Sequence, residues 1–162
     1  MNADAKKWES LLMRETEAGD AEKVNEFFDA MGAESRALFN RGNYNRQALL
    51  KQCTEPDPTY RYWLALRDGQ MLGYVFLAHW NTGVPILGIA VRDDLKGMRL
   101  GGYLMDYAIE KAKAAGKGGI FLTTHIANIR GQVLYESRGF ECMGTYRNAK
   151  ELFYLLAFKD EA

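Results

Sequence analysis

The stretch that decides the fold runs from residue 85 to residue 102 and reads PILGIAVRDDLKGMRLGG. Its first seven residues are apolar, which is the length and composition of a strand buried on both faces. Residues 96–102 then bring glycines into a loop that opens a helix. A helix N-terminus offers unpaired backbone N–H groups and the positive end of the helix dipole, and this combination binds phosphate. The stretch therefore predicts a strand, a phosphate-binding loop and a helix in succession.

Length and composition indicate one globular domain over residues 1–162, with 48% hydrophobic and 26% charged residues. Lys+Arg and Asp+Glu both number 21, so no basic excess favours nucleic acid or an anionic membrane as partner. No segment reaches the roughly 18 apolar residues of a membrane span, and the first residues do not resemble a signal peptide. We expect a cytoplasmic protein with Cys53 and Cys142 as free thiols, although a disulfide stays open.

The first half of the sequence predicts short helices and a hairpin. A strand is expected at 9–15 and a helix at 20–31, with Asp20 as its N-cap and Gly32 at its end. Further helical turns are expected at 35–39 and 47–52, around a polar loop at 40–45. Residues 60–67 and 71–80 form a hairpin across the Asp68-Gly69 turn. The aromatic cluster at 60–63 is expected to be core with one solvated face rather than a nucleic-acid platform.

The second half alternates helices and strands. After the loop, an apolar face is expected at Leu100, Leu104, Ala108, Ala112 and Ala115. A strand at 120–124, a helix at 128–138 closed by Gly139, and a hairpin of 140–147 with 152–159 complete the chain. The fold class is α/β (α+β), with a mixed, mostly antiparallel sheet of about six to seven strands and helices on both faces. A Rossmann domain is excluded, since no G-x-G-x-x-G follows a strand.

In combination these motifs resemble the GNAT superfamily of acyl-CoA-dependent N-acyltransferases. In that family a strand ends in an apolar triplet, and a spacer of four residues follows it. The loop motif Arg/Gln-x-x-Gly-x-Gly/Ala comes next and leads into a helix. An Asn then stands seven residues before a Tyr, which Gly-Phe follows. Here the triplet is 89–91, the loop is 96–101, and the second motif reads Asn128, Tyr135 and Gly139-Phe140.

Two positions depart from the family pattern. Lys96 stands where Arg or Gln is usual, which keeps a cation but loses the bidentate fork of arginine. Arg99 stands where Gly is usual. If Arg99 has ordinary helical dihedral angles, its N–H still points at the ligand and its side chain leaves outward.

The resemblance implies a direct transfer of an acetyl group from acetyl-CoA to a primary amine. It assigns the backbone groups of Ile89 and Val91, on a strand that splays from its neighbour, to the pantetheine arm and the thioester carbonyl. Tyr135 is the expected general acid for the leaving thiolate. The cofactor-binding residues expected from the resemblance, with no metal site, are Ile89, Ala90, Val91, Lys96, Gly97, Met98, Arg99, Leu100, Gly101, Gly102, Asn128 and Tyr135.

Simpler structural roles exist for several of these residues. Tyr135 could be an aromatic side chain packed under the sheet, and Gly101 and Gly102 could serve helix–sheet packing. Asn128 is expected to cap a helix as well as to contact pantetheine. A general base is needed because an alkyl amine is mostly protonated at pH 7. The candidates are His79, His125, Glu34, Glu151 or water, and the plain alternatives are structural histidines and surface carboxylates.

The acceptor stays open between a small metabolite or antibiotic-like amine and a protein α-amine or lysine. An acyl group other than acetyl, and a homodimer, also stay open. The competing hypothesis from another class is a non-catalytic acyl-CoA-binding or sensor module, since the strand at 84–91 lacks a carboxylate.

Overall fold

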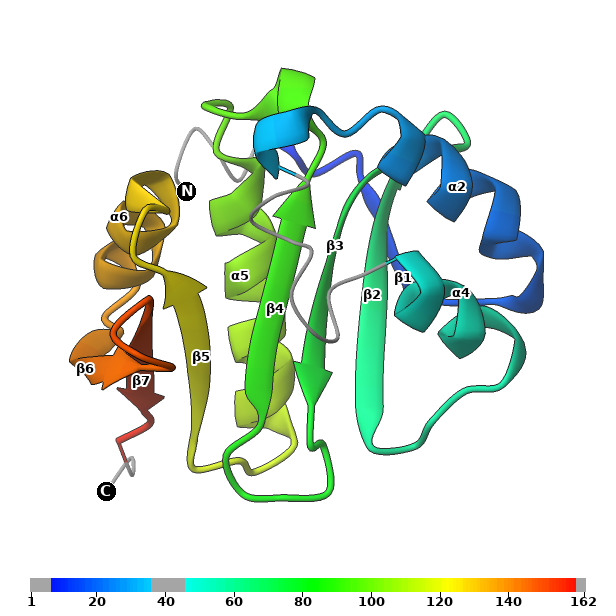
Figure 1. Cartoon of the computed structure of the whole chain (residues 1–162). Helices are drawn as coiled ribbons and strands as arrows, with labels where there is room; N and C mark the ends of the chain where they lie inside the picture. Colours follow the sequence, from blue (N-terminus) through cyan, green and yellow to red (C-terminus); the bar gives the residue numbers. More distant parts are fainter. Residues whose placement is uncertain (1–6, 36–45, 160–162) are drawn as a thin grey trace.

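A seven-stranded sheet in the order β1-β2-β3-β4-β5-β7-β6 organises the protein (Figure 1). The computed structural model describes residues 7–35 and 46–159. All neighbouring strands are antiparallel except β4 and β5, which are parallel. The mixed, mostly antiparallel sheet expected from the sequence is confirmed.

The first half of the chain builds one edge of the sheet and the two helices that cover it. Its elements are β1 (Leu12–Glu15), the 3-10 turn η1 (Ala18–Asp20), α2 (Ala21–Asp29), α4 (Arg46–Thr54), β2 (Tyr60–Arg67) and β3 (Gln70–Ala78). The predicted hairpin turn is confirmed, because Asp68 and Gly69 have φ angles of 52° and 77°, as a two-residue turn of this kind requires. The helical turns expected at 35–39 lie, apart from Ser35, outside the described residues, and so does the polar loop at 40–45.

The second half supplies the phosphate-loop helix and the other edge of the sheet. Its elements are β4 (Ile86–Val91), η3 (Asp93–Leu95), α5 (Leu100–Ala114), β5 (Gly119–His125), α6 (Ile129–Ser137), β6 (Glu141–Tyr146) and β7 (Glu151–Ala157). Leu100, Leu104, Ala108 and Ala112 are fully buried, as the apolar periodicity predicts. Ala115 is exposed because α5 ends one residue before it.

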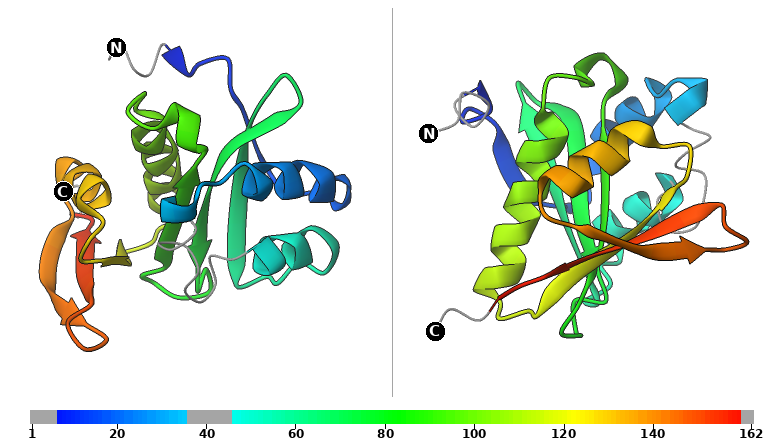
Figure 2. Two further views of the ribbon diagram at one scale, coloured as in Figure 1. Left: turned by 45° about the horizontal axis from the view of Figure 1, so that its top comes forward. Right: turned by 90° about the vertical axis from the view of Figure 1, so that its left-hand side faces the viewer.

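The sheet separates two layers of helices (Figure 2). We call the side that carries α2 and α4 the front face and the side that carries α5 and α6 the back face. Phe27, Phe28 and Tyr74 belong to the front core, whereas Trp63, Leu104 and Tyr135 belong to the back core. Since β2 is covered on both faces, Tyr62 and Trp63 are both buried. The expectation that this aromatic strand has a solvated face is wrong.

Asp20 has a different role from the one expected. Its carboxylate accepts hydrogen bonds from both terminal nitrogens of Arg14, at 2.8 and 2.7 Å, and from the N–H of Glu17 at 2.7 Å. It makes no capping bond to the N-terminus of α2. The bond from Arg14 is the main reason that the pKa of Asp20 lies below its usual value, although burial opposes the change. The residue therefore joins β1 to α2 instead of capping a helix.

Candidate active site

A gap opens between β4 and β5 at their C-terminal ends. The two strands form one ladder pair, Ile86 with Phe121, and the N–H of Phe121 donates to the Pro85 carbonyl at 3.0 Å. Beyond this pair the ladder stops, and the strands diverge (Figure 1). Backbone groups that a continuous sheet would use are thereby left facing the gap.

The register with β3 identifies which β4 groups face that gap. The N–H of Arg92 donates to the Leu72 carbonyl at 2.9 Å. Hydrogen-bonding direction alternates along a strand, so Gly88 and Ala90 direct their backbone groups to β3. Ile89 and Val91 consequently direct theirs toward β5 and the gap, which is the orientation that their predicted role requires.

The loop before α5 presents a helix N-terminus to the same gap. Arg99 occupies the N-cap position in a left-handed conformation, with φ 64° and ψ 20°, and its side chain does not cap the helix. The N–H of Tyr103 donates to the Arg99 carbonyl at 3.3 Å. The N–H groups of Leu100, Gly101 and Gly102 therefore precede the first intrahelical bond and point out of the helix end.

The left-handed Arg99 differs from the sequence expectation of ordinary helical angles. Glycine reaches this region without the steric cost that a Cβ brings. This left-handed conformation explains why glycine is usual at this position in the family that the sequence resembles. In this chain Arg99 adopts the same left-handed backbone conformation. The loop geometry is therefore retained at some cost in backbone strain.

A single cleft unites the predicted cofactor residues. Eleven of the twelve line it, together with Leu95, Ala127, Ile129, Arg130, Gly131, Leu134 and Glu34. Met98 does not line it. Its side chain packs against the back core, and its carbonyl accepts a hydrogen bond from the indole N–H of Trp8 at 3.1 Å. The structure thus places Met98 behind the loop rather than in the cleft.

Asn128 caps α6, as the sequence predicts. Its side-chain oxygen accepts from the N–H of Gly131 at 3.1 Å, and its amide nitrogen donates to the Thr124 hydroxyl at 3.0 Å. These two bonds fix the start of α6 against the end of β5. Because Asn128 also lines the cleft, its contact with pantetheine stays a prediction compatible with the capping role.

Tyr135 combines the two roles weighed from the sequence. It is 8% exposed, and its ring packs against Phe140 and Tyr154 at centroid distances of 6.3 and 5.8 Å. It nevertheless lines the cleft beside Ile89 and Val91. A phenol anchored in the core on one side and open to the cleft on the other can present its hydroxyl at a fixed position. Its role as general acid stays a prediction.

Gly101 and Gly102 permit the close approach of α5 and α6, which lie side by side in Figure 2. A Cβ on Gly101 would lie 3.2 Å from a methyl carbon of Leu134, and one on Gly102 would overlap the guanidinium of Arg138. That guanidinium donates to Asp106 at 3.1 Å. The packing role expected for these glycines is therefore present, chiefly against α6, while a Cβ on Gly101 would also lie 3.9 Å from Val91 of the sheet.

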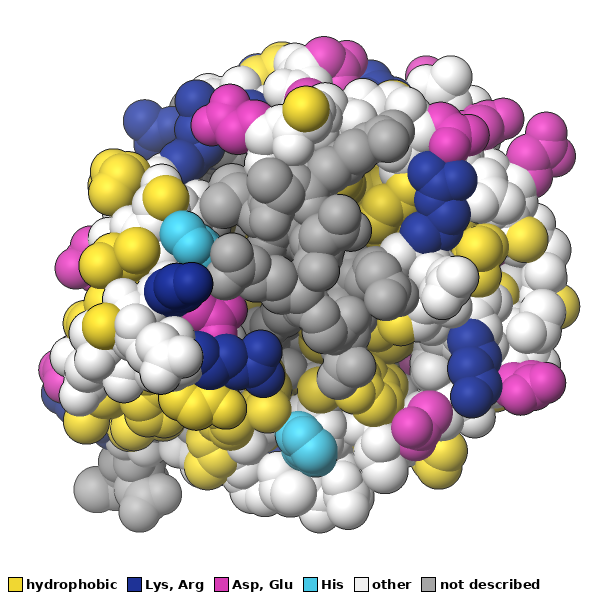
Figure 3. Space-filling model, in the orientation of Figure 1, with side chains coloured by type: hydrophobic (Ala, Val, Ile, Leu, Met, Phe, Trp, Pro, Cys, Tyr) yellow, Lys and Arg dark blue, Asp and Glu magenta, His cyan; other side chains and the backbone are white. Residues whose placement is uncertain are grey.

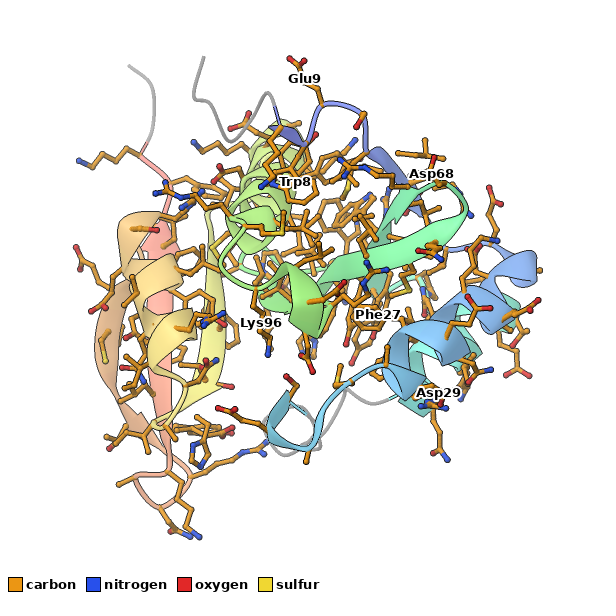
Figure 4. The ribbon with its side chains drawn as sticks, turned by 90° about the horizontal axis from the view of Figure 1, so that it is seen from above. Trp8, Glu9, Phe27, Asp29, Asp68 and Lys96 are labelled. Atoms are coloured by element: carbon orange, nitrogen blue, oxygen red, sulfur yellow. The ribbon has the colours of Figure 1, made fainter. Side chains whose placement is uncertain are left out.

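Lys96 is engaged by protein groups. Its ammonium lies 3.1 Å from the Asp93 carboxylate and hydrogen-bonds to the Ser35 hydroxyl. Figure 4 shows the side chain pointing from its loop toward the segment that follows α2. Asp93 also accepts from the N–H of Gly32 and from the Ser35 hydroxyl, each at 2.6 Å. Partial burial alone would raise the pKa of Asp93, but these hydrogen bonds outweigh it and hold the pKa below its usual value.

Arg130 is the most informative cleft residue that sequence reasoning missed. It is exposed, in the first turn of α6. The sequence did contain a signal for it, because the Asn128 cap marks a second helix N-terminus directly after β5, the parallel neighbour of β4. Two such N-termini converge at the ends of β4 and β5, which makes the cleft favourable for anions.

The four candidate bases lie in different places. His79 follows β3 where Ala78 pairs with Ile86, at the end of β4 remote from the cleft. His125 is the last residue of β5 and is half-buried, and Glu34 is exposed and lines the cleft. Glu151 begins β7 and is only 8% exposed, so the expectation that it is a surface carboxylate is wrong.

Three further features concern metal ligands, membrane-spanning helices and the cysteines. Within residues 7–35 and 46–159, no group of three or more His, Cys, Asp or Glu side chains is arranged to hold a metal ion. In the same part of the chain, none of the helices has the length and apolar character needed to cross a bilayer. Cys53 and Cys142 are free thiols, the first buried and the second exposed.

The fold and the cleft agree with comparisons with known proteins. The family model described as acetyltransferase (GNAT) family matches residues 24–140, so the chain belongs to the GNAT family, whose cosubstrate is acetyl-CoA. Among curated proteins, the aminoalkylphosphonate N-acetyltransferase of Salmonella typhimurium is 30% identical over 91 residues. That match covers 52% of this chain and 59% of the relative, which is less than two thirds of its length.

Solved structures share the fold at low sequence identity. A domain from Methanocaldococcus jannaschii has a TM-score of 0.74 and 18% identity over 91% of this chain and 98% of its own. PaiA N-acetyltransferase from Thermoplasma acidophilum, in complex with coenzyme A, has a TM-score of 0.73 and 17% identity over 92% and 99% of the two chains. The GNAT domain of S. lividans PAT has a TM-score of 0.79 and 13% identity over 91% and 90%.

Proposed function

We propose that this protein is an N-acetyltransferase that moves an acetyl group from acetyl-CoA directly to a primary amine of a small molecule. The observation that carries the proposal is the single cleft in which the backbone groups of Ile89 and Val91 meet the N-terminus of α5. A thioester with a pyrophosphate-bearing tail needs both features, one beside its carbonyl and one beside its phosphates. We treat residues 1–162 as one catalytic domain.

The residues present fit such a ligand. The N–H groups of Leu100, Gly101 and Gly102 have no intrahelical acceptor, and they lie at the positive end of α5. Arg99 and Arg130 add cations to the cleft lining. The half-buried side chains of Ile89 and Val91 and the side chain of Leu134 give its inner wall an apolar character suited to a pantetheine arm.

When bound, acetyl-CoA supplies the activated acetyl group. The N–H of Ile89 or Val91, aimed into the gap, would stabilise negative charge developing on the thioester oxygen. Tyr135, fixed by its ring contacts with Phe140 and Tyr154, would donate a proton to the departing thiolate sulfur. The front-face side of the gap would admit the amine, whose proton must pass to a base or to water.

Different observations support the proposals for the acceptor, the partners and the cellular location. The printed name of the curated relative, an aminoalkylphosphonate N-acetyltransferase, supports a small acceptor. Balanced charge supports neither nucleic acid nor a membrane as partner, and two free thiols are in keeping with a cytoplasmic location. A homodimer stays open. A protein acetyltransferase and a non-catalytic acyl-CoA-binding module remain the competing functions.

An acceptor screen tests the proposal. The protein is mixed with acetyl-CoA and a panel of small amines, amino acids, aminoalkylphosphonates and peptides, and the release of free thiol is followed. We expect amine-dependent thiol release with at least one small-molecule class. Release with peptides alone would favour the protein acetyltransferase, and cofactor binding without release on any amine would favour the binding module.

A further inference from the structure

The buried carboxylate of Glu151, on the front face, lacks a hydrogen-bond donor in the described part of the chain for one of its oxygens. The buried carboxylates among the described residues are Asp20 and Glu151. Arg14 and the N–H of Glu17 satisfy Asp20. In contrast, Oε2 of Glu151 is buried and accepts no hydrogen bond from any residue that the structure describes. Leaving a buried charged oxygen without a donor is costly, so this position favours a ligand that brings one.

The nearest cation satisfies Glu151 poorly. Arg147 Nε lies 3.6 Å from Oε2, beyond hydrogen-bonding distance, and the arginine side chain is 62% exposed. Its guanidinium also lies over the ring of Tyr146, 5.3 Å from the centroid. The two partners differ in exposure, because the Glu151 side chain is only 10% exposed. A ligand ammonium within hydrogen-bonding distance of Oε2 would satisfy the carboxylate better than Arg147 does at 3.6 Å.

Glu151 lies on the front face beside the end of β5. It is the register partner of His125, and the next partners along that face are Thr123 with Phe153 and Phe121 with Leu155. Ile86 is the partner of Phe121 and packs against the front core. Strand alternation therefore puts His125 and Glu151 on the front face. Figure 3 views this front face and shows cationic and acidic side chains close to one another on its left-hand side.

His125 is the cross-strand neighbour of Glu151. The N–H of Ile126 donates to the Lys150 carbonyl at 2.9 Å, so His125 and Glu151 form the adjacent non-hydrogen-bonded pair, in which side chains lie closest. Nδ1 of His125 accepts the N–H of Ala127 at 3.0 Å. In the neutral ring Nε2 then carries the proton. His125 is therefore the cross-strand neighbour of Glu151, and its free N–H makes no hydrogen bond to Oε2 of the carboxylate.

The distance from Glu151 to the gap determines which nitrogen it can bind. The reacting nitrogen must lie over the gap between β4 and β5, and β5 lies between that gap and β7. Strands in a sheet are about 4.8 Å apart, so Glu151 is roughly 7–9 Å to one side of the reacting nitrogen. This separation exceeds direct contact, but a chain of about four carbon atoms spans it. A second ammonium at the far end of such an acceptor would reach the carboxylate.

We infer that Glu151 is a specificity-determining residue that binds a second ammonium group of the acceptor and so selects short diamines over monoamines. The inference rests on the proposed function, because it places the reacting nitrogen over the gap. Arg147, in the β6–β7 turn, competes for the same carboxylate. Glu34 lies among the cleft residues and adds a second negative charge.

Direct binding tests this inference without turnover. 1,4-Diaminobutane and n-butylamine, which have the same carbon count, are titrated calorimetrically into protein saturated with coenzyme A. We expect the diamine to bind roughly ten- to hundredfold more tightly, as a charged hydrogen bond provides. Glu151→Gln should abolish this preference and leave butylamine binding unchanged. Glu141→Gln, at the exposed far end of the same hairpin, is the matched control and should keep the preference.

Two further variants test the inference independently in case Glu151→Gln does not fold. Arg147→Ala removes the competing cation and should strengthen diamine binding, and Glu151→Asp keeps the charge and should retain part of the preference. Melting temperatures verify folding. Equal binding of both amines by the wild-type protein would overturn the inference. So would a folded Glu151→Gln protein with the wild-type preference, or one with equal losses for both amines.

The same samples separate this inference from the proposed function. A diamine preference that depends on Glu151, in a protein that releases no thiol from acetyl-CoA with any amine, would contradict the enzyme activity and leave the cation site standing. Thiol release that is as fast with butylamine as with the diamine, at equal subsaturating concentration, would contradict the specificity alone.

Discussion

Ser35 donates a hydrogen bond to Asp93 at 2.6 Å, although 58 residues separate them in the sequence. Asp93 is the first residue of η3, two positions after the end of β4, and Ser35 belongs to the segment after α2. The N–H of Gly32 donates to the same carboxylate at 2.6 Å, and Lys96 lies 3.1 Å from it. One carboxylate thus fastens the front-face segment at 32–35 to the loop that is expected to hold the cofactor phosphates.

Asp93→Asn should loosen this connection and lower the free energy of unfolding by roughly 1–2 kcal/mol at pH 7. The pKa of Asp93 is lowered in the folded protein. Its stabilisation is therefore present above the unfolded-state pKa and is lost as the pH falls through the folded-state value. The difference between the two proteins should shrink as the pH falls below about 4. Urea unfolding at several pH values measures this.

The control for this prediction is Asp94→Asn. The carboxylate of Asp94 is 63% exposed and pairs with Arg92, so its replacement should change stability by less than about 0.5 kcal/mol. A difference between wild-type and Asp93→Asn proteins that is constant from pH 7 to pH 3 would show that the charge of Asp93 is not what stabilises the connection.

Acetyl-CoA should stabilise the folded protein. At a ligand concentration 100-fold above Kd the gain is about 2.7 kcal/mol, which corresponds to a rise in Tm of roughly 5–10 °C for a domain of this size. NAD and ATP should raise Tm much less, because neither has a pantetheine arm to occupy the gap between β4 and β5. An equal shift with all three ligands would indicate a general anion site.

Gly101→Asp should abolish this shift. The new carboxylate would stand among the N–H groups expected to bind phosphate and would repel it electrostatically. Since a Cβ at this position lies 3.2 Å from a Leu134 methyl carbon, a modest loss of stability is also expected. Gly19→Asp, where nothing lies within 4 Å of the added Cβ, is the matched control. Normal cofactor binding by a folded Gly101→Asp protein would remove the loop from the site.

Tyr135→Phe should lower kcat by roughly 10–100-fold while KM for acetyl-CoA changes little. The ring contacts with Phe140 and Tyr154 are retained, and a proton donor acts in the transition state rather than in ground-state binding. Tyr154→Phe, in the same core but outside the cleft, should keep near-normal kcat. Single-turnover rates make the comparison, because product release could otherwise mask the chemical step. Equal rates for Tyr135→Phe and wild type would leave Tyr135 with a packing role alone.

Local sequence signals predicted the parts of the structure that local chemistry determines. The Asp68-Gly69 turn, the Asn128 cap and the succession from β4 through the loop to α5 all follow from neighbouring residues. The left-handed Arg99 was missed because its side chain does not favour that conformation, and only the surrounding loop imposes it. Ala115 was misassigned because helix ends are poorly marked in sequence.

Long-range contacts account for the remaining differences. Lys96 was expected at the phosphates, and its contact with Ser35 depends on a chain segment 61 residues away. Glu151 resembles a surface residue in sequence, since it follows a polar turn, and it becomes buried only through its pairing with His125 across β5 and β7. Such burial cannot be read from a strand pattern without knowing which strands are neighbours.

The measurement that tests the account most directly follows an isotopically labelled acetyl group from acetyl-CoA to the accepting amine by mass spectrometry. The account predicts one labelled acetyl group on the amine nitrogen for each thiol released, with wild-type yield in Gly19→Asp and none above background in Gly101→Asp. The contradicting result would be unlabelled amines throughout the panel, with acetyl-CoA bound at the cleft and recovered intact. That outcome would make the protein an acyl-CoA-binding module.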